Sequence, residues 1–196
     1  MPQRQSLRNL HYAALSKDTA DSLAYEKPQP LVGAISAKIS PTSNQEKLWA
    51  DDGVFDIAST LGDIALEIEL ATLPIKAQAV LLGHTYENGV MTMKDTDEPP
   101  YLAIGFMSQP QPGRFRFVWL YKGKFALVQD EYATATDSAA WRNAKLTGTF
   151  VKREHDGMWQ VIADSSDEGF TGADHWFKAV YPLEPEAEES EPEENP

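Results

Sequence analysis

Short stretches in which apolar and polar residues alternate run through most of the chain, and they predict β-strands. In LEIEL (66–70), for example, Leu66, Ile68 and Leu70 alternate with Glu67 and Glu69, as in a strand with one buried face. By the same criterion, together with a richness in β-branched and aromatic residues, we predict strands at 9–15, 31–39, 54–59, 63–70, 90–93, 101–107, 114–122, 124–128, 145–153, 158–163 and 176–181.

Residue pairs that favour tight turns separate many of these stretches. They are Asp52-Gly53, Asn88-Gly89, Pro112-Gly113, Lys122-Gly123 and Asp156-Gly157. Strands at this density, joined by hairpin turns and without regular intervening helices, predict a mainly β fold. We expect an antiparallel β-sandwich or barrel of two packed sheets.

One stretch, 73–82, departs from the alternation and predicts a single flanking α-helix. Its apolar residues recur at helical spacing: Leu73, Ala77, Val80 and Leu81. Gly83 follows as a C-cap should, and Thr72 is the candidate N-cap. A helix of about ten residues is too short to be stable alone in water, so we expect it to pack on a sheet.

The chain divides into a single β domain, 1–181, and an acidic tail, 182–196. The tail mixes glutamate with proline and contains one large apolar residue, Leu183, so we expect it to be disordered. Segments 16–30 and 40–53 are polar and lack clear periodicity. They predict an extended N-terminal segment and a loop around 40–53, one of which would become ordered only against a neighbouring subunit.

Charge and cysteine content narrow the classes of function. The net charge is −13, and seven of these charges belong to glutamates of the tail, which leaves −6 (13 less 7) on the domain. Such a surface repels phosphate backbones and disfavours tight binding to nucleic acid. The chain has no cysteine, which excludes disulfides, thiolate metal sites and a cysteine nucleophile. It has no apolar run of about 18 residues, so we expect no membrane partner.

Glu67 and Glu69 are the most suggestive pair of polar side chains. Residues two apart on a strand lie about 6 to 7 Å apart on one face, a spacing that overlaps that of the carboxylates of inverting glycosidases. A metal site and an ordinary solvated face would show the same pattern, and the solvated face is the common case. The four histidines are scattered in sequence, at His11, His84, His155 and His175. We therefore predict no metal, no cofactor and no enzymatic activity.

The stretch 113–127 places four aromatic residues on one strand face: Phe115, Phe117, Trp119 and Tyr121. With the neighbouring arginines it is similar to an RNA-binding strand. Arg114 and Arg116, however, occupy positions where such strands need glycine or alanine so that bases can stack closely. We interpret the aromatic face as sandwich core.

Seven segments, taken in order, closely resemble the major tail proteins, or tail tube proteins, of long-tailed, non-contractile bacteriophages. They are RNLHYAAL, LVGAISAKISP, LWADDGVFDIASTLGDIALEIEL, LLGHTYENGVM, PPYLAIGFMS, GRFRFVWLYKGKFAL, and LTGTFVKRE followed by DGMWQV. The resemblance covers roughly residues 5–165. Residues 166–181 match less clearly, and the acidic tail has no counterpart.

The resemblance implies a structural virion protein without an active site. Its fold would be an antiparallel β-sandwich with a flanking helix. Six copies would close into a ring, and the rings would stack into a tube around a tape-measure protein, together with tail-completion proteins. Double-stranded DNA would pass through the lumen without specific binding. The protein would be made in the cytoplasm of the host bacterium and end in the phage tail.

Within such a tube Glu67 and Glu69 are candidates for an acidic lumen. The alternatives are the outside of the tube and an intersubunit salt bridge. A different class of function is also open: a carbohydrate-binding or receptor-binding β-sandwich of a phage or bacterial surface structure. In that case an exposed Trp141 or Tyr86 would stack on sugar rings.

Overall fold

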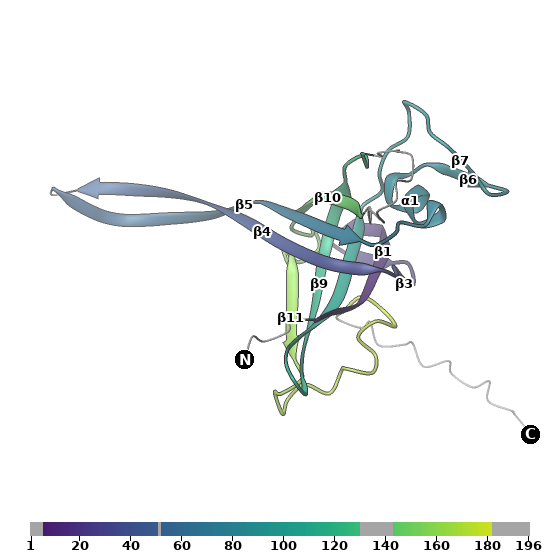
Figure 1. The fold of residues 1–196 in the computed structure, drawn as a ribbon. Coiled ribbons are helices and arrows are strands. Elements are labelled where there is room, and N and C mark those ends of the chain that lie inside the picture. Colours follow the sequence, from purple (N-terminus) through teal and green to yellow (C-terminus); the bar gives the residue numbers. More distant parts are fainter. Residues whose placement is uncertain (1–5, 51, 130–142, 182–196) are drawn as a thin grey trace, which may run out of the picture.

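The protein is mainly β, with antiparallel strand pairing and one short helix (Figure 1). The computed structural model describes residues 6–50, 52–129 and 143–181. Its strands are β1 (Ser6–Thr19), β2 (Ser22–Tyr25), β3 (Gln29–Pro30), β4 (Ala34–Ala50), β5 (Gly53–Leu70), β6 (Thr85–Glu87), β7 (Val90–Thr92), β8 (Leu102–Gln111), β9 (Arg114–Phe125), β10 (Ala144–Val151) and β11 (Gln160–Asp164). The predicted fold class is confirmed.

Most strands belong to one large sheet, in the order β2-β1-β8-β9-β10-β5-β4. β3 pairs with β1 and β11 pairs with β9, while β6 and β7 form a separate hairpin. The large sheet bends so that its two halves pack on each other as the two layers of a β-sandwich. The side chains between the layers come from both halves, and together they form the main core.

β5 shows how the sequence pattern builds this core. Ile64, Leu66, Ile68 and Leu70 are fully buried, and the residues between them point away from the core. From the opposite layer β8 and β9 supply Leu102, Ile104, Phe106, Val118 and Leu120. The alternation read from the sequence of 63–70 therefore gives the correct buried face.

A second core covers the other face of β9. Phe117, Trp119 and Tyr121 pack there against Trp176 and Val180, which follow the last strand. The Trp119 indole N–H donates a 3.0 Å hydrogen bond to the backbone oxygen of Trp176. The predicted strand at 176–181 is wrong, because this segment forms turns.

Gly123 does not form the predicted turn at Lys122-Gly123, because β9 continues through it to Phe125. The ring of Phe150 on β10 lies directly against Gly123. A Cβ at Gly123 would come within 2.4 to 2.6 Å of three ring atoms, which is too close for any side chain. The glycine is thus a packing requirement and not a turn signal. At the other four predicted turns the backbone does adopt positive φ, at Asp52, Asn88, Gly89, Gly113 and Gly157.

The predicted loop around 40–53 is also wrong in its first part. β4 extends to Ala50, and β5 is continuous where two strands, 54–59 and 63–70, were predicted. The polar residues of 40–50 pair with β5, from Ser40↔Ala65 to Ala50↔Gly53, which satisfies the backbone groups on that side of β4. Segment 16–30 likewise contains β2 and β3, two short strands beside β1. The predicted disordered tail, 182–196, lies outside the described residues.

The helix α1 (Ile75–Leu82) lies at the end of β5 that is farther from the β4–β5 turn (Figure 1). Gly83 caps it with φ 73°, as predicted. The N-cap is Pro74, without a side-chain hydrogen bond, so Thr72 is not the cap. Ala77 and Leu81 are buried, but Val80 is exposed, so only part of the predicted apolar face packs. No helix of the described segments has the length and apolarity needed to cross a bilayer.

Candidate functional site

The most distinctive surface feature is a long two-stranded arm that projects from the body (Figure 1). We define the arm as residues 43–50 and 53–61, the outer parts of β4 and β5. β10 pairs with β5 only from Ile64 to Leu70, so nearer the tip β5 has β4 as its single partner. At about 3.3 Å per residue, the β4 side of the arm from Ser43 to Ala50 spans about 25 Å.

Large apolar side chains on the arm face solvent. Five of them have exposed fractions between 45% and 72%: Leu48, Trp49, Phe55, Ile57 and Leu61. Because side chains alternate along a strand, Ile57 and Leu61 share one face of β5, and Phe55 precedes them at a register shift near the tip. A contiguous apolar stripe of this kind on a protein surface marks an interaction site.

β4 also presents a free strand edge. It is the last strand of the sheet order, so the backbone groups on its outer side have no partner strand among the residues that the structure describes. Pro41 and the adjoining register shift interrupt this edge, as is typical of edge strands. An isolated two-stranded hairpin is marginal in water, so an arm of this length is expected to be stabilised by a partner.

Glu67 and Glu69 lie on β5 nearer the body than the apolar stripe, and the register shift between Leu61 and Ile64 places them on the opposite strand face from Leu61. Lys145 on β10 contacts Glu67 across the sheet, with 3.3 Å between Nζ and Oε2. Glu69 accepts hydrogen bonds from the Asn143 amide at 2.8 Å and the Ser36 hydroxyl at 3.4 Å. Lys38 is the strand neighbour of Glu67 on the β4 side. The pair is therefore half-exposed, and it is flanked by lysines on both sides.

The histidines have separate surroundings. His84 contacts Asp97 at 2.7 Å, His155 contacts the Thr19 backbone oxygen at 3.1 Å, and His11 stacks on Phe177. Within the described ranges, no three His, Asp or Glu residues are grouped so that they could hold a metal ion.

The predicted aromatic face of β9 is confirmed as core. Phe117, Trp119 and Tyr121 are buried beneath the segment 170–181, so no flat aromatic face is open to a nucleobase there. Of the two aromatic residues considered for sugar binding, Tyr86 is exposed on β6. Trp141 lies outside the described residues.

The arm was not predicted from the sequence. The signal that could have found it is the stretch LWADDGVFDI (48–57), where large apolar residues lie on both sides of a turn and polar residues continue on each side. In an isolated hairpin such residues have no core to enter, which indicates a surface that another chain covers. No protein-family model and no curated protein matches this chain.

Proposed function

We propose that the chain is the major tail tube subunit of a long-tailed bacteriophage, which works by polymerising into stacked hexameric rings. The observation that supports this best is the arm. It combines an exposed apolar stripe, a free edge and a reach of about 25 Å. A feature of this kind serves no purpose in an isolated molecule, whereas in a polymer it can lie on a neighbouring copy.

The mode of association follows from the shape of the arm. The stripe is on a projection that can reach a different part of the next molecule, as the proposed ring requires. Contacts between unlike surfaces are heterologous, and they generate a ring when the rotation closes. Closure also covers strand edges that would otherwise promote uncontrolled aggregation. This agrees with the ring implied by the sequence resemblance.

The negative charge of the chain suits a conduit for DNA, because repelled phosphates slide past without being held. We keep Glu67 and Glu69 as candidate lumen residues. In that position the neighbouring Lys38 and Lys145 would face the lumen as well. These two glutamates and two lysines would together carry no net charge, so a net negative lumen would depend on other residues.

The arm provides a direct test of this function. Phe55→Ser combined with Ile57→Ser removes two apolar side chains that are already exposed, so the fold of the single chain should be unaffected. The control is Val90→Ser on the β6–β7 hairpin, where Val90 has a comparable exposed fraction of 63%. In sedimentation velocity, the wild type and the control should form rings or tubes, and the arm variant should remain a single chain. Equal assembly of all three would contradict the proposal.

A further inference from the structure

A cavity of about 200 Å³ adjoins the second core, away from the arm. Its walls come from three parts of the chain: β2 with the turn at 26–28, Arg153 after β10, and residues 178–180. The proposed assembly function does not use this cavity. Its volume would hold several water molecules, at about 30 Å³ each, so it has room for a side chain of a ligand.

Arg153 is the unusual component of the wall. It is 1% exposed, and its guanidinium lies 3.7 Å from the centre of the Tyr121 ring. Its Nε donates to Asp156 Oδ1 at 3.0 Å, and its Nη2 also pairs with the Asp156 carboxylate. Its Nη1 is buried and has no hydrogen-bond partner of good geometry among the described residues, although the Tyr25 hydroxyl lies near the guanidinium. Burial lowers the pKa of Arg153, but Asp156 and then this hydroxyl raise it above its ordinary value. A buried donor without a good acceptor is destabilising, and a ligand oxygen in the cavity would satisfy it.

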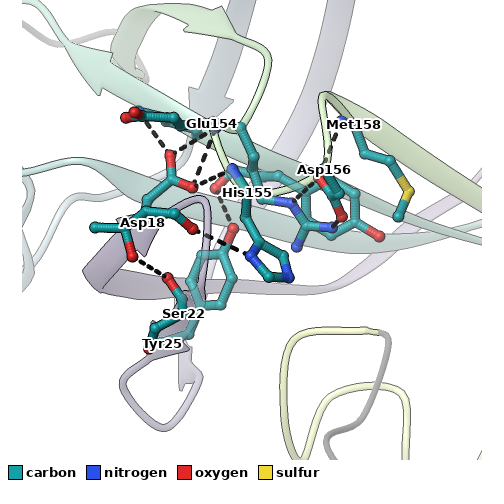
Figure 2. Close-up of polar contacts among 11 residues, drawn as sticks. Asp18, Ser22, Tyr25, Glu154, His155, Asp156 and Met158 are labelled. Carbon is teal, nitrogen blue, oxygen red and sulfur yellow. Dashed lines mark hydrogen bonds and ion pairs between the residues drawn. The ribbon is translucent and has the colours of Figure 1, made fainter.

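Hydrogen bonds hold the surroundings of Arg153 in place (Figure 2). The Asp18 carboxylate accepts from the backbone N–H groups of Glu154 and His155, and from Lys122 Nζ at 2.6 Å. The Tyr25 hydroxyl donates to the Tyr121 backbone oxygen at 3.0 Å. These contacts fix the β1–β2 hairpin to the segment that carries Arg153. The cavity is thus preformed and does not need to close around its ligand.

The charges around the cavity favour an anion. Arg153, Lys27 and Lys178 line it together with a single acidic residue, Glu26. Asp156 offsets the charge of Arg153, so the two exposed lysines at the rim supply most of the attraction. An Arg N–H that points at a free acceptor forms its strongest bonds with a carboxylate or a phosphate oxygen. The class of ligand is therefore an oxyanion.

A carboxylate source begins next to the cavity. Val180 lines the wall, and the acidic stretch 182–196, which contains seven glutamates, follows directly in the chain. Glu184 is four residues beyond Val180, so it can lie no more than about 14 Å away along an extended chain. A short tether of this kind gives an effective concentration in the millimolar range, so a weak site suffices.

We propose that this cavity is a carboxylate-binding site for the acidic stretch 182–196 of the same chain, in which a glutamate accepts a hydrogen bond from Arg153 Nη1. The stretch is thereby held against β2 and the turn at 26–28. Elsewhere the domain is net negative and repels it.

The absence of native cysteine makes the site testable in the full-length chain. Glu26→Cys at the rim and Ser190→Cys in the acidic stretch introduce the only two thiols. The protein is kept at a concentration too low for assembly, and oxidised glutathione is added. The rate at which the disulfide forms then measures how often the two positions meet. Arg153 is buried and ion-paired, so its truncation could unfold the chain, and the test uses the exposed rim. Lys27→Glu with Lys178→Glu reverses the rim charges, and Lys38→Glu with Lys145→Glu makes the same change of net charge elsewhere.

We expect the chain with the two cysteines alone to form an intramolecular disulfide. Reversing the charges of the two rim lysines should slow its formation about tenfold, and changing the seven glutamates of the stretch to glutamine should slow it by the same factor. The control reversal should stay within about twofold of the parent rate. Equal rates in all four chains would show that the stretch moves freely and would overturn the proposal. Disulfides formed only between molecules would overturn it as well, because the occupant would then belong to another copy.

Discussion

The indole ring of Trp119 lies flat against the backbone of Gly105 on the neighbouring strand, and a Cβ at Gly105 would come within 2.6 Å of three ring atoms. Trp119 is fully buried and cannot retreat, since the segment 170–181 covers it. This contact fixes the spacing between β8 and the second core. It also explains why a glycine occurs in the middle of a central strand.

We expect Gly105→Ala to lower the free energy of unfolding by about 1 to 3 kcal/mol, because the added methyl group overpacks the second core. Urea denaturation measures this. Gly53→Ala is the matched control, because nothing lies within 4 Å of a Cβ there. It should change stability by less than about 0.5 kcal/mol. Similar losses in the two variants would show that backbone entropy, and not the Trp119 contact, sets the effect.

Trp176 should be the residue through which the segment after β11 stabilises the domain. Trp176→Ala removes a fully buried ring from the second core, and we expect it to cost about 3 to 5 kcal/mol. Trp49→Ala deletes the same side chain from the exposed arm and should leave the stability of the single chain nearly unchanged. Thermal unfolding of the two variants compares them directly. A small effect of Trp176→Ala would mean that the segment merely rests on the sheet.

The pair Arg114–Asp164 predicts a response to acid. Hydrogen bonds from the Arg114 side chain, and then from the side chain and backbone of Ser166, hold the pKa of Asp164 well below its ordinary value of 3.8. The unfolded chain therefore binds this proton more readily than the folded chain. The stabilisation is present above pH 3.8 and is lost as the pH falls below it. Between about pH 5 and pH 2, the melting temperature of Asp164→Asn should fall less than that of the wild type. Parallel curves would contradict this.

One variant distinguishes an intersubunit contact of Glu67 and Glu69 from an exposed position in the lumen or on the outside of the tube. Glu67→Gln with Glu69→Gln removes two half-exposed charges, and each lost contact should cost less than about 1 kcal/mol in the single chain. If both residues face the lumen or the outside of the tube, electron microscopy should find tubes as abundant as those of the wild type. A loss of tubes with unchanged monomer stability would place the pair in an intersubunit contact instead.

The sequence predicts the inner layers of this fold better than its projections. In β5 the alternation from Ile64 to Leu70 identifies the buried face correctly, because the core imposes a period of two on that strand. The same strand between Gly53 and Gly62 enters no core, and its pattern lacks that constraint. The sequence pattern therefore predicts a separate strand and a loop for the arm. In the structure, this part of β5 is extended because it pairs with β4.

Glycine was ambiguous for a related reason. The glycines at 113 and 157 occur at turns and adopt positive φ, whereas Gly123 and Gly105 are needed because the aromatic rings of Phe150 and Trp119 lie on them. These ring contacts join residues that are far apart in sequence, and no local pattern reveals them. The cavity beside Arg153 could not be predicted either, because it is assembled from three distant segments.

The central claim, that this chain works by closing into rings with its own copies, is tested most directly by negative-stain electron microscopy of the purified protein at rising concentration. We predict hollow rings with sixfold end views that stack into tubes. Single compact particles at every concentration, under conditions in which the chain is folded, would contradict the account.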